Sequence, residues 1–235
     1  MKLAIMQPYF FPYLGYFSLI LIADEFILFD TPQYIRHGWI ERNRILKLDG
    51  EPLYIKVALK KHKRETAIKD IVINNEVNWQ SKIKAQLDSY KKKAPHFQQV
   101  TEMFDPIISK EYSSIVDLNY EILSTICGFL EVKTPIKIWS KMEVDIEEVN
   151  APDEWALNIC KALKAESYYN PEGGIDFFDR KKYLSSGIEI NFLRYKSENY
   201  DQLGNEFVPN LSIIDVLMFN SKEEIQKMLQ NYELI

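Results

Sequence analysis

The chain has 235 residues, of which 46% are hydrophobic and 27% are charged, and its formal net charge is −5. This composition is typical of a globular protein with a substantial core, and the length suits one large α/β domain. The negative charge argues against a nucleic-acid partner. The apolar run 10–21 is too short to cross a membrane, and no secretory signal is evident, so we expect a cytoplasmic protein without a membrane span.

Two cysteines, Cys127 and Cys160, both lie in apolar, helix-like stretches. The chain has no CxxC pattern and no Cys/His cluster, so we expect two buried reduced thiols and no structural metal. The motifs GxGxxG, GxxxxGK[ST], GxSxG and HExxH are also absent. Dinucleotide, P-loop, serine-hydrolase and zinc-protease chemistry therefore has no support, and the cofactor stays unknown.

The first elements form a strand–helix–strand unit. Residues 3–6 read as a buried strand, 8–12 as a proline-rich loop, 15–23 as a helix and 26–29 as a second strand that ends at Asp30. Two strands joined through a helix are typical of a parallel βαβ unit.

The middle of the chain reads as an insertion. Asp49-Gly50 between residues 39–48 and 53–59 is a strong hairpin signal. A cationic run, 60–69, follows, and we expect it to be a solvated connector. A short strand at 71–73 and helices at 78–93, 106–108 and 115–130 come next, with Asn78 as a helix cap. We therefore expect a possible helical subdomain over about residues 76–132.

The last part returns to alternation. It contains strands at 136–139, 167–170 and 188–192, and helices at 152–164, 179–185, 212–220 and 222–230. Strands that alternate with helices predict a Rossmann-like α/β fold, in which a mainly parallel sheet is flanked by helices and the hairpin is inserted. We expect residues 1–235 to form a single domain.

The first candidate functional segment, QPYFFPYLGYF, lies where a strand ends and a helix begins. Ligands of open α/β sheets bind at such positions, and a helix N-terminus favours an anion. The alternative is an aromatic loop that only packs. The candidate ligand-binding residues in this segment are Gln7, Tyr9, Tyr13, Gly15 and Tyr16.

The second segment, 30–45, follows the second strand and should open on the same sheet edge. Three of the six arginines and one of the three histidines fall here. Arginine suits phosphate or carboxylate recognition, and histidine suits proton transfer near neutral pH. A solvated strand face is the alternative. We expect catalytic roles for His37, Arg36 and Arg44, and ligand-binding roles for Asp30, Gln33, Arg42 and Asn43.

The third segment, YYNPEGGIDFFD at 168–179, follows another strand. Gly173 and Gly174 could present backbone N–H groups to an anion, whereas Glu172 or Asp176 could bind a hydroxyl, an amine or a metal. A plain turn is the alternative, since a double glycine alone is a weak signal.

Together these segments resemble a known family. IMQPYFFPYLGYF, ADEFILFD and GWIERNRI resemble the opening of WbqC-like proteins, and the resemblance continues through IVINNEVNW, SYKKKAPHF, SYYNPEGGIDFFD and FVPNLSIIDVLMFN. It covers nearly the whole chain. The family is associated with bacterial surface-polysaccharide and O-antigen gene clusters, which implies a role in that setting.

A second, more distant resemblance is to HxGH nucleotidyltransferases, including pantothenate synthetase. Those enzymes open with a strand, HxGH at a helix start and a second strand. This chain has Tyr13-Leu14-Gly15-Tyr16 at the equivalent place, so both histidines are replaced by tyrosine. The histidines stabilise phosphate charge in adenylyl transfer, and their absence puts that chemistry in doubt.

Three functions follow from these observations. The first is a transferase that moves an acyl or aminoacyl group onto a nucleotide-linked amino sugar, with His37 as base. The second is a nucleotidyltransferase-like enzyme with an altered HxGH site. The third is a non-catalytic protein that binds a ligand or partner in glycan assembly. The first implies a small-molecule partner, a nucleotide sugar, while the oligomeric state is open.

Overall fold

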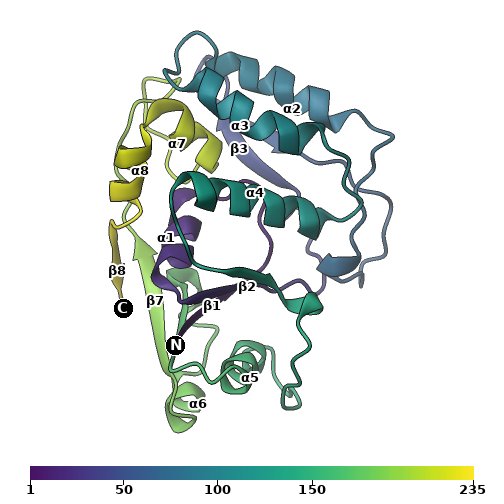
Figure 1. The fold of residues 1–235 in the computed structure, drawn as a ribbon, viewed down its shortest axis with the longest axis vertical. Helices are drawn as coiled ribbons and strands as arrows, with labels where there is room; N and C mark the ends of the chain where they lie inside the picture. Colours follow the sequence, from purple (N-terminus) through teal and green to yellow (C-terminus); the bar gives the residue numbers. More distant parts are fainter.

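Six strands form one sheet and two form a separate hairpin in the computed structural model, which describes residues 1–235 (Figure 1). The strands are β1 (Lys2–Met6), β2 (Glu25–Leu28), β3 (Arg42–Leu46), β4 (Pro52–Lys56), β5 (Ile136–Ile138), β6 (Ser167–Pro171), β7 (Glu189–Tyr195) and β8 (Tyr232–Leu234). The helices are α1 (Leu14–Ile22), α2 (Trp79–Leu87), α3 (Phe97–Ser109), α4 (Ile115–Phe129), α5 (Glu154–Ala162), α6 (Arg180–Ser185), α7 (Ile213–Phe219) and α8 (Lys222–Met228).

The main sheet has the order β5-β2-β1-β6-β7-β8. All neighbouring pairs are parallel except β7 and β8, which are antiparallel. The five parallel strands, numbered along the chain, have the order 3-2-1-4-5 of a Rossmann-like sheet. The predicted α/β class is confirmed. The edge strand β8, at the end of the chain, was not predicted from the sequence.

Side chains of β1 alternate between two cores, as the period of a strand requires. Leu3 and Ile5 pack with α5 and α6 on one face, whereas Ala4 packs with α1 on the other. Figure 1 shows α5 and α6 on one side of the sheet and α1 and α4 on the opposite side. The sheet is therefore covered on both faces, as a parallel sheet must be.

The hairpin β3–β4 is inserted between β2 and β5. Its pairing runs from Arg42 opposite Lys56 to Leu46 opposite Pro52. Gly50 in its turn has φ +88°, and a Cβ there would approach within 2.7 Å of the Gly204 backbone. Glycine is thus required both by the backbone conformation and by the close approach of a second loop.

Several local boundaries differ from the sequence-based expectation. Helix α3 begins at Phe97 and contains Pro106, whereas the sequence predicted only 106–108, since proline is normally excluded from helix interiors. Helix α2 ends at Leu87 and continues only as a short 3-10 turn. In the predicted strand 71–73, only Val72 and Ile73 pair, each through an isolated bridge.

Helices α2, α3 and α4 share one continuous hydrophobic core with α1, α7, α8 and one face of the sheet. This continuity supports a single domain for residues 1–235, in which 76–132 are a helical part. The domain division itself stays a prediction. Both cysteines are free and buried, as expected, and burial raises the pKa of Cys127 to about 12. None of the helices combines the length and the apolar composition needed to cross a membrane.

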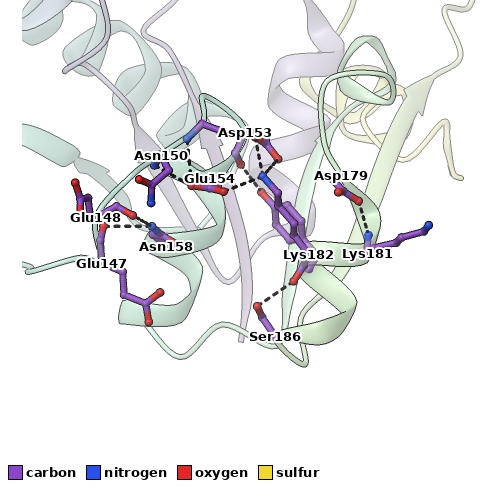
Figure 2. Close-up of polar contacts among 12 residues, drawn as sticks. Glu147, Glu148, Asn150, Asp153, Glu154, Asn158, Asp179, Lys181, Lys182 and Ser186 are labelled. Atoms are coloured by element: carbon purple, nitrogen blue, oxygen red, sulfur yellow. Dashed lines mark hydrogen bonds and ion pairs between the residues drawn. The ribbon is translucent and has the colours of Figure 1, made fainter.

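On the face of the sheet that α5 and α6 cover, a lysine links these two helices (Figure 2). The Lys182 ammonium lies 3.1 Å from the Asp153 carboxylate and 2.8 Å from that of Glu154. The Glu154 carboxylate also accepts hydrogen bonds from the backbone N–H groups of Asn150 and Ala151. The Glu154 carboxylate thus bonds only to groups of the chain itself, and this cluster holds the start of α5 in place.

A buried carboxylate, Asp215, connects α7 to the region around the hairpin. It accepts hydrogen bonds from the Tyr90 hydroxyl at 2.6 Å and the Tyr200 hydroxyl at 2.8 Å. The Tyr90 oxygen in turn accepts from the Leu46 backbone N–H. Burial raises the pKa of Asp215 to about 6, although both hydroxyls oppose that shift.

We predict that Asp215→Asn removes a pH-dependent part of stability. Between about pH 4 and pH 6 the folded state holds a proton on Asp215 that the unfolded chain releases, so this contribution is complete at low pH and is lost as pH rises through 6. The unfolding free energy of wild type minus that of Asp215→Asn should fall by roughly 3 kcal/mol between about pH 4 and pH 7. Urea denaturation at both values measures it.

The exposed Asp145→Asn is the matched control, because it removes the same charge without disturbing a buried network. Its difference from wild type should stay flat over that range. A flat difference for Asp215→Asn as well would contradict the assignment of the proton to Asp215.

Candidate functional site

The loops after β1, β2 and β6 all leave the carboxyl edge of the sheet. The strand order reverses between β1 and β6, because the connection after β1 runs over one face and the connection after β6 over the other. Open α/β sheets bind their ligands in the crevice at this point. The three sequence segments singled out above therefore belong to one edge.

The loop between β1 and α1 is held by its own backbone at Phe11, which has φ +43°. The Phe11 carbonyl accepts hydrogen bonds from the Asn43 side-chain amide at 2.5 Å and from the Ser212 hydroxyl at 2.9 Å. The Phe10 N–H donates to the Trp39 carbonyl at 2.9 Å. The loop is thus clamped to β3, to the start of α7 and to the loop after β2. We call these contacts the Phe11 clamp.

The tyrosines of the first segment are largely occupied by the protein itself. Tyr16 is 1% exposed and donates its hydroxyl proton to the Gln7 carbonyl at 2.9 Å. A Cβ on Gly15 would come within 2.5 Å of the Tyr13 ring and 2.8 Å of Tyr195. These rings cover the start of α1, where the sequence predicted an anion site. Gln7 is half-buried at the end of β1.

The third segment lies close to the first. Burial raises the pKa of Tyr13, and the negative charge of Glu172 raises it further. Glu172 in turn accepts a hydrogen bond from Arg194 at 2.7 Å. Gly174 packs against the Asn170 side chain, while a Cβ on Gly173 would meet no atom within 4 Å. Of the two predicted glycines, only Gly173 therefore faces open space.

Three aromatic rings from separate elements form a stack, which we call the aromatic stack: Tyr9, Trp39 and Tyr54. Ring centroids of Tyr9 and Trp39 lie 5.8 Å apart at 24°, and those of Trp39 and Tyr54 lie 6.4 Å apart at 23°. Trp39 is 37% exposed and Tyr54 is 45% exposed. Burial raises the pKa of Tyr9, the innermost member. The stack thus presents partly exposed ring edges beside the end of β1.

Two of the three predicted arginines are engaged with this stack. The Arg42 guanidinium lies 4.6 Å from the Tyr54 ring centroid and donates to the carbonyls of His37 and Gly38. The Arg44 guanidinium lies 5.6 Å from the Trp39 centroid and weakly contacts the Asn210 carbonyl at 3.5 Å. Such cation–π contacts stabilise both partners. Two donor nitrogens of Arg42 are thus used within the chain, whereas Arg44 keeps most of its donors free.

Two further predicted residues occupy different environments. Asp30 is 1% exposed and accepts from the Ser140 N–H at 2.9 Å and from the Ser140 hydroxyl, so it ties the end of β2 to the end of β5. His37 is exposed and has φ +63°, with its carbonyl held by Arg42. Its imidazole has no hydrogen-bond partner within the chain.

Arg36 and Gln33 line a surface cavity of about 460 Å³, which we call the basic cavity; its wall is formed by residues 33–36 and 62–64. Two contacts join these segments. Gln33 and Ala67 form an isolated β-bridge, and the Tyr34 N–H donates a hydrogen bond to the Thr66 carbonyl. Tyr34, His62, Lys63 and Arg64 were not predicted as site residues; the last three lie in the cationic run, which reads as a solvated connector. The signal available was the cationic run itself, which follows directly after the hairpin.

Four of the eleven buried polar side-chain atoms without a partner belong to these segments: Thr31 Oγ1, Glu41 Oε2, Arg44 Nε and His62 Nε2. Glu41 is 1% exposed, and its carboxylate raises the pKa of Tyr34 through a hydrogen bond, second to the effect of burial. Unsatisfied buried groups are rare in proteins and often mark sites of function. No group of three or more His, Cys, Asp or Glu side chains is placed to share a metal ion.

These features describe an α/β protein with a Rossmann-like sheet whose carboxyl edge carries aromatic and cationic side chains. The WbqC-like protein family matches residues 7–227, and the chain belongs to this family. This membership suggests a polysaccharide-associated function. The uncharacterized protein Rv1507c of Mycobacterium tuberculosis is 28% identical over 237 residues, which cover 97% of each chain. No solved structure matches the chain.

We predict that Asn43→Ala lowers the unfolding free energy by about 1–3 kcal/mol, because it removes one of the two side-chain donors to the buried Phe11 carbonyl and leaves Ser212 as the other. It should also loosen the aromatic stack and reduce the near-UV circular dichroism of the aromatic side chains. Urea denaturation and near-UV spectra measure the two effects.

Asn75→Ala is the matched control, since that amide donates to the Tyr112 carbonyl away from the stack. It should cost stability and leave the near-UV spectrum intact. Equal spectra for the two variants would contradict the role given to Asn43.

Proposed function

We propose that the protein is a transferase of bacterial surface-polysaccharide biosynthesis that moves an acyl or aminoacyl group onto a nucleotide-linked amino sugar. The observation that carries this proposal is the aromatic stack with Arg42 and Arg44, at the carboxyl edge of a Rossmann-like sheet. Exposed ring edges beside guanidinium groups suit a ligand that combines a sugar, a base and phosphates.

In this reaction the sugar amine attacks the carbonyl carbon of an activated acyl donor, such as a thioester. A C–N bond forms, the bond from carbon to sulfur breaks, and the thiolate leaves. His37 takes the amine proton, since its exposed imidazole has no competing partner within the chain. Arg36 and Arg44 supply positive charge to the developing oxyanion or to the phosphates. Gln7 and Gly173, with its open surroundings, complete the proposed ligand surface.

A second candidate function is non-catalytic docking of a partner protein in glycan assembly. The observation in its favour is that Ile35, Trp39 and Tyr54 are 61%, 37% and 45% exposed. Exposed apolar side chains close together mark interaction surfaces. The nucleotidyltransferase alternative has less support, because the Tyr16 hydroxyl is already bonded to Gln7 and cannot stabilise a phosphate.

We predict that UDP-glucosamine raises the melting temperature of the protein, since a ligand that binds only the native state stabilises it. Trp39→Ala should weaken that binding about tenfold or more, because it removes the centre of the aromatic stack. Tyr120→Phe, at a site with the same 37% exposure on α4, is the control and should bind like wild type. Thermal shift and calorimetry measure both.

We also predict that His37→Ala abolishes acyl transfer and changes the melting temperature little, because the side chain is exposed and makes no hydrogen bond within the chain. Turnover is followed as thiol release from acyl thioesters with UDP-glucosamine as acceptor. Normal turnover in purified His37→Ala would remove His37 from the mechanism. Failure of every nucleotide-linked sugar to bind would favour the docking function.

A further inference from the structure

We propose that the basic cavity is a binding site for a diphosphate group. The inference rests on the proposed function in one respect: the diphosphate of a nucleotide-linked sugar is its intended occupant. The cavity itself is argued from its own residues, and the same chemistry would accept free diphosphate.

The lining of the cavity is cationic. Arg36, Lys63 and Arg64 contribute three permanent positive charges, and no acidic side chain lines the wall. Arg36, Lys63 and Arg64 take part in none of the ion pairs of the structure, unlike Lys56, Lys84 or Arg194. In a chain of net charge −5, three unpaired cations around one hollow create a local field that favours an anion.

The volume fits this ligand class. At about 460 Å³ the cavity falls in the range of small-molecule sites, roughly 300–1,000 Å³. It holds a diphosphate with room for an attached sugar or nucleoside. Gln33 and Tyr34 add an amide and an aromatic face to the wall. Guanidinium groups bind phosphate oxygens in a forked, bidentate geometry, which suits Arg36 and Arg64.

His62 is held in a defined orientation at the wall. Its Nδ1 lies 3.0 Å from the Lys60 carbonyl, which can only accept, so Nδ1 carries the proton. The ring meets the Tyr34 ring edge-on, with centroids 5.0 Å apart. The opposite nitrogen, Nε2, is enclosed without a partner. As the unprotonated nitrogen, Nε2 can only accept, so a phosphate oxygen does not bond it, and the ring serves to shape the wall that carries the three cations.

The carboxylates of Glu41 and Glu65 lie outside the wall of the basic cavity, which is consistent with an anionic ligand. Glu41 is 1% exposed, and its carboxylate lies 4.0 Å from the Lys56 ammonium. It is not part of the cavity wall, and Glu65 in the cationic run is exposed outside the wall as well. The cavity therefore offers cations and donors to a ligand, while the acidic groups nearby lie outside its lining.

The test uses inorganic pyrophosphate as probe and the double variant Lys63→Gln/Arg64→Gln. Calorimetry should give a pyrophosphate Kd at least tenfold higher for this variant than for wild type, and wild-type binding should weaken as salt is raised. Lys91→Gln/Lys92→Gln is the matched control, because it removes two adjacent exposed charges elsewhere and should change Kd less than twofold. All four positions are exposed, so both variants should fold.

The location is read from the three histidines by NMR. Pyrophosphate should shift the His62 ring signals and leave those of His96, at the start of α3, unchanged. His62→Gln assigns the signal. The proposal is overturned if wild type binds no pyrophosphate at millimolar concentration, if both double variants lose affinity equally, or if His62 does not respond.

UDP-glucosamine in the same experiment separates this inference from the proposed function. If it shifts His62 and binds more tightly than pyrophosphate, both are supported. If pyrophosphate passes every test and UDP-glucosamine binds more weakly, the cavity is a diphosphate site and the proposed function fails. If UDP-glucosamine binds with His62 unmoved and unaffected by Lys63→Gln/Arg64→Gln, the cavity inference fails alone.

Discussion

The Phe11 clamp is the contact on which the arrangement of the site depends. One carbonyl, in a backbone conformation that non-glycine residues rarely adopt, accepts hydrogen bonds from β3 and from the start of α7. Asn43 is fully buried, so its amide has no water to bond in place of this carbonyl. The clamp draws the inserted hairpin onto the loop after β1. The aromatic stack exists only because these two segments meet there.

The cations around the site stand in two settings. Arg42 and Arg44 lie over aromatic rings, and Arg42 also donates to two backbone carbonyls, so both guanidinium groups are held beside the aromatic stack. Arg36, Lys63 and Arg64 line a hollow without ion pairs. Cationic side chains thus occur in two settings between Arg36 and Arg64: beside aromatic rings and around the basic cavity. The difference is set by whether an aromatic or carbonyl partner lies within reach.

Much of the fold could be predicted from sequence because it depends on local patterns. The apolar runs, the proline-rich loop after β1 and the turn at Asp49-Gly50 led to the correct sheet class and the correct hairpin. The interior of α3 was missed because Pro106 argues against a helix, although neighbouring helices hold it. The edge strand β8 was also missed, because it is short and carries almost no periodic signal.

The candidate site was harder to predict, because its geometry depends on contacts between distant segments. The loops after β1 and β2 were correctly placed at one edge, because each follows a strand of the same parallel unit. The roles of individual residues were not decided, since nothing in the sequence shows that Asn43 reaches Phe11, or that Asp30 is capped by Ser140. The pairing of 33–34 with 66–67 is likewise a tertiary contact. It turns an apparent solvated connector into the wall of a cavity.

The central claim is that the loops after β1 and β2, together with the cationic run, form one ligand-binding surface. Hydrogen–deuterium exchange in the presence and absence of UDP-glucosamine tests it most directly, because it reports every segment at once. Exchange should slow in residues 7–13, 33–42 and 62–66, and α5 and α6 should be unchanged. Protection confined to other segments, such as the cavity around Tyr200 and Phe207 or the Lys182 cluster, would contradict it.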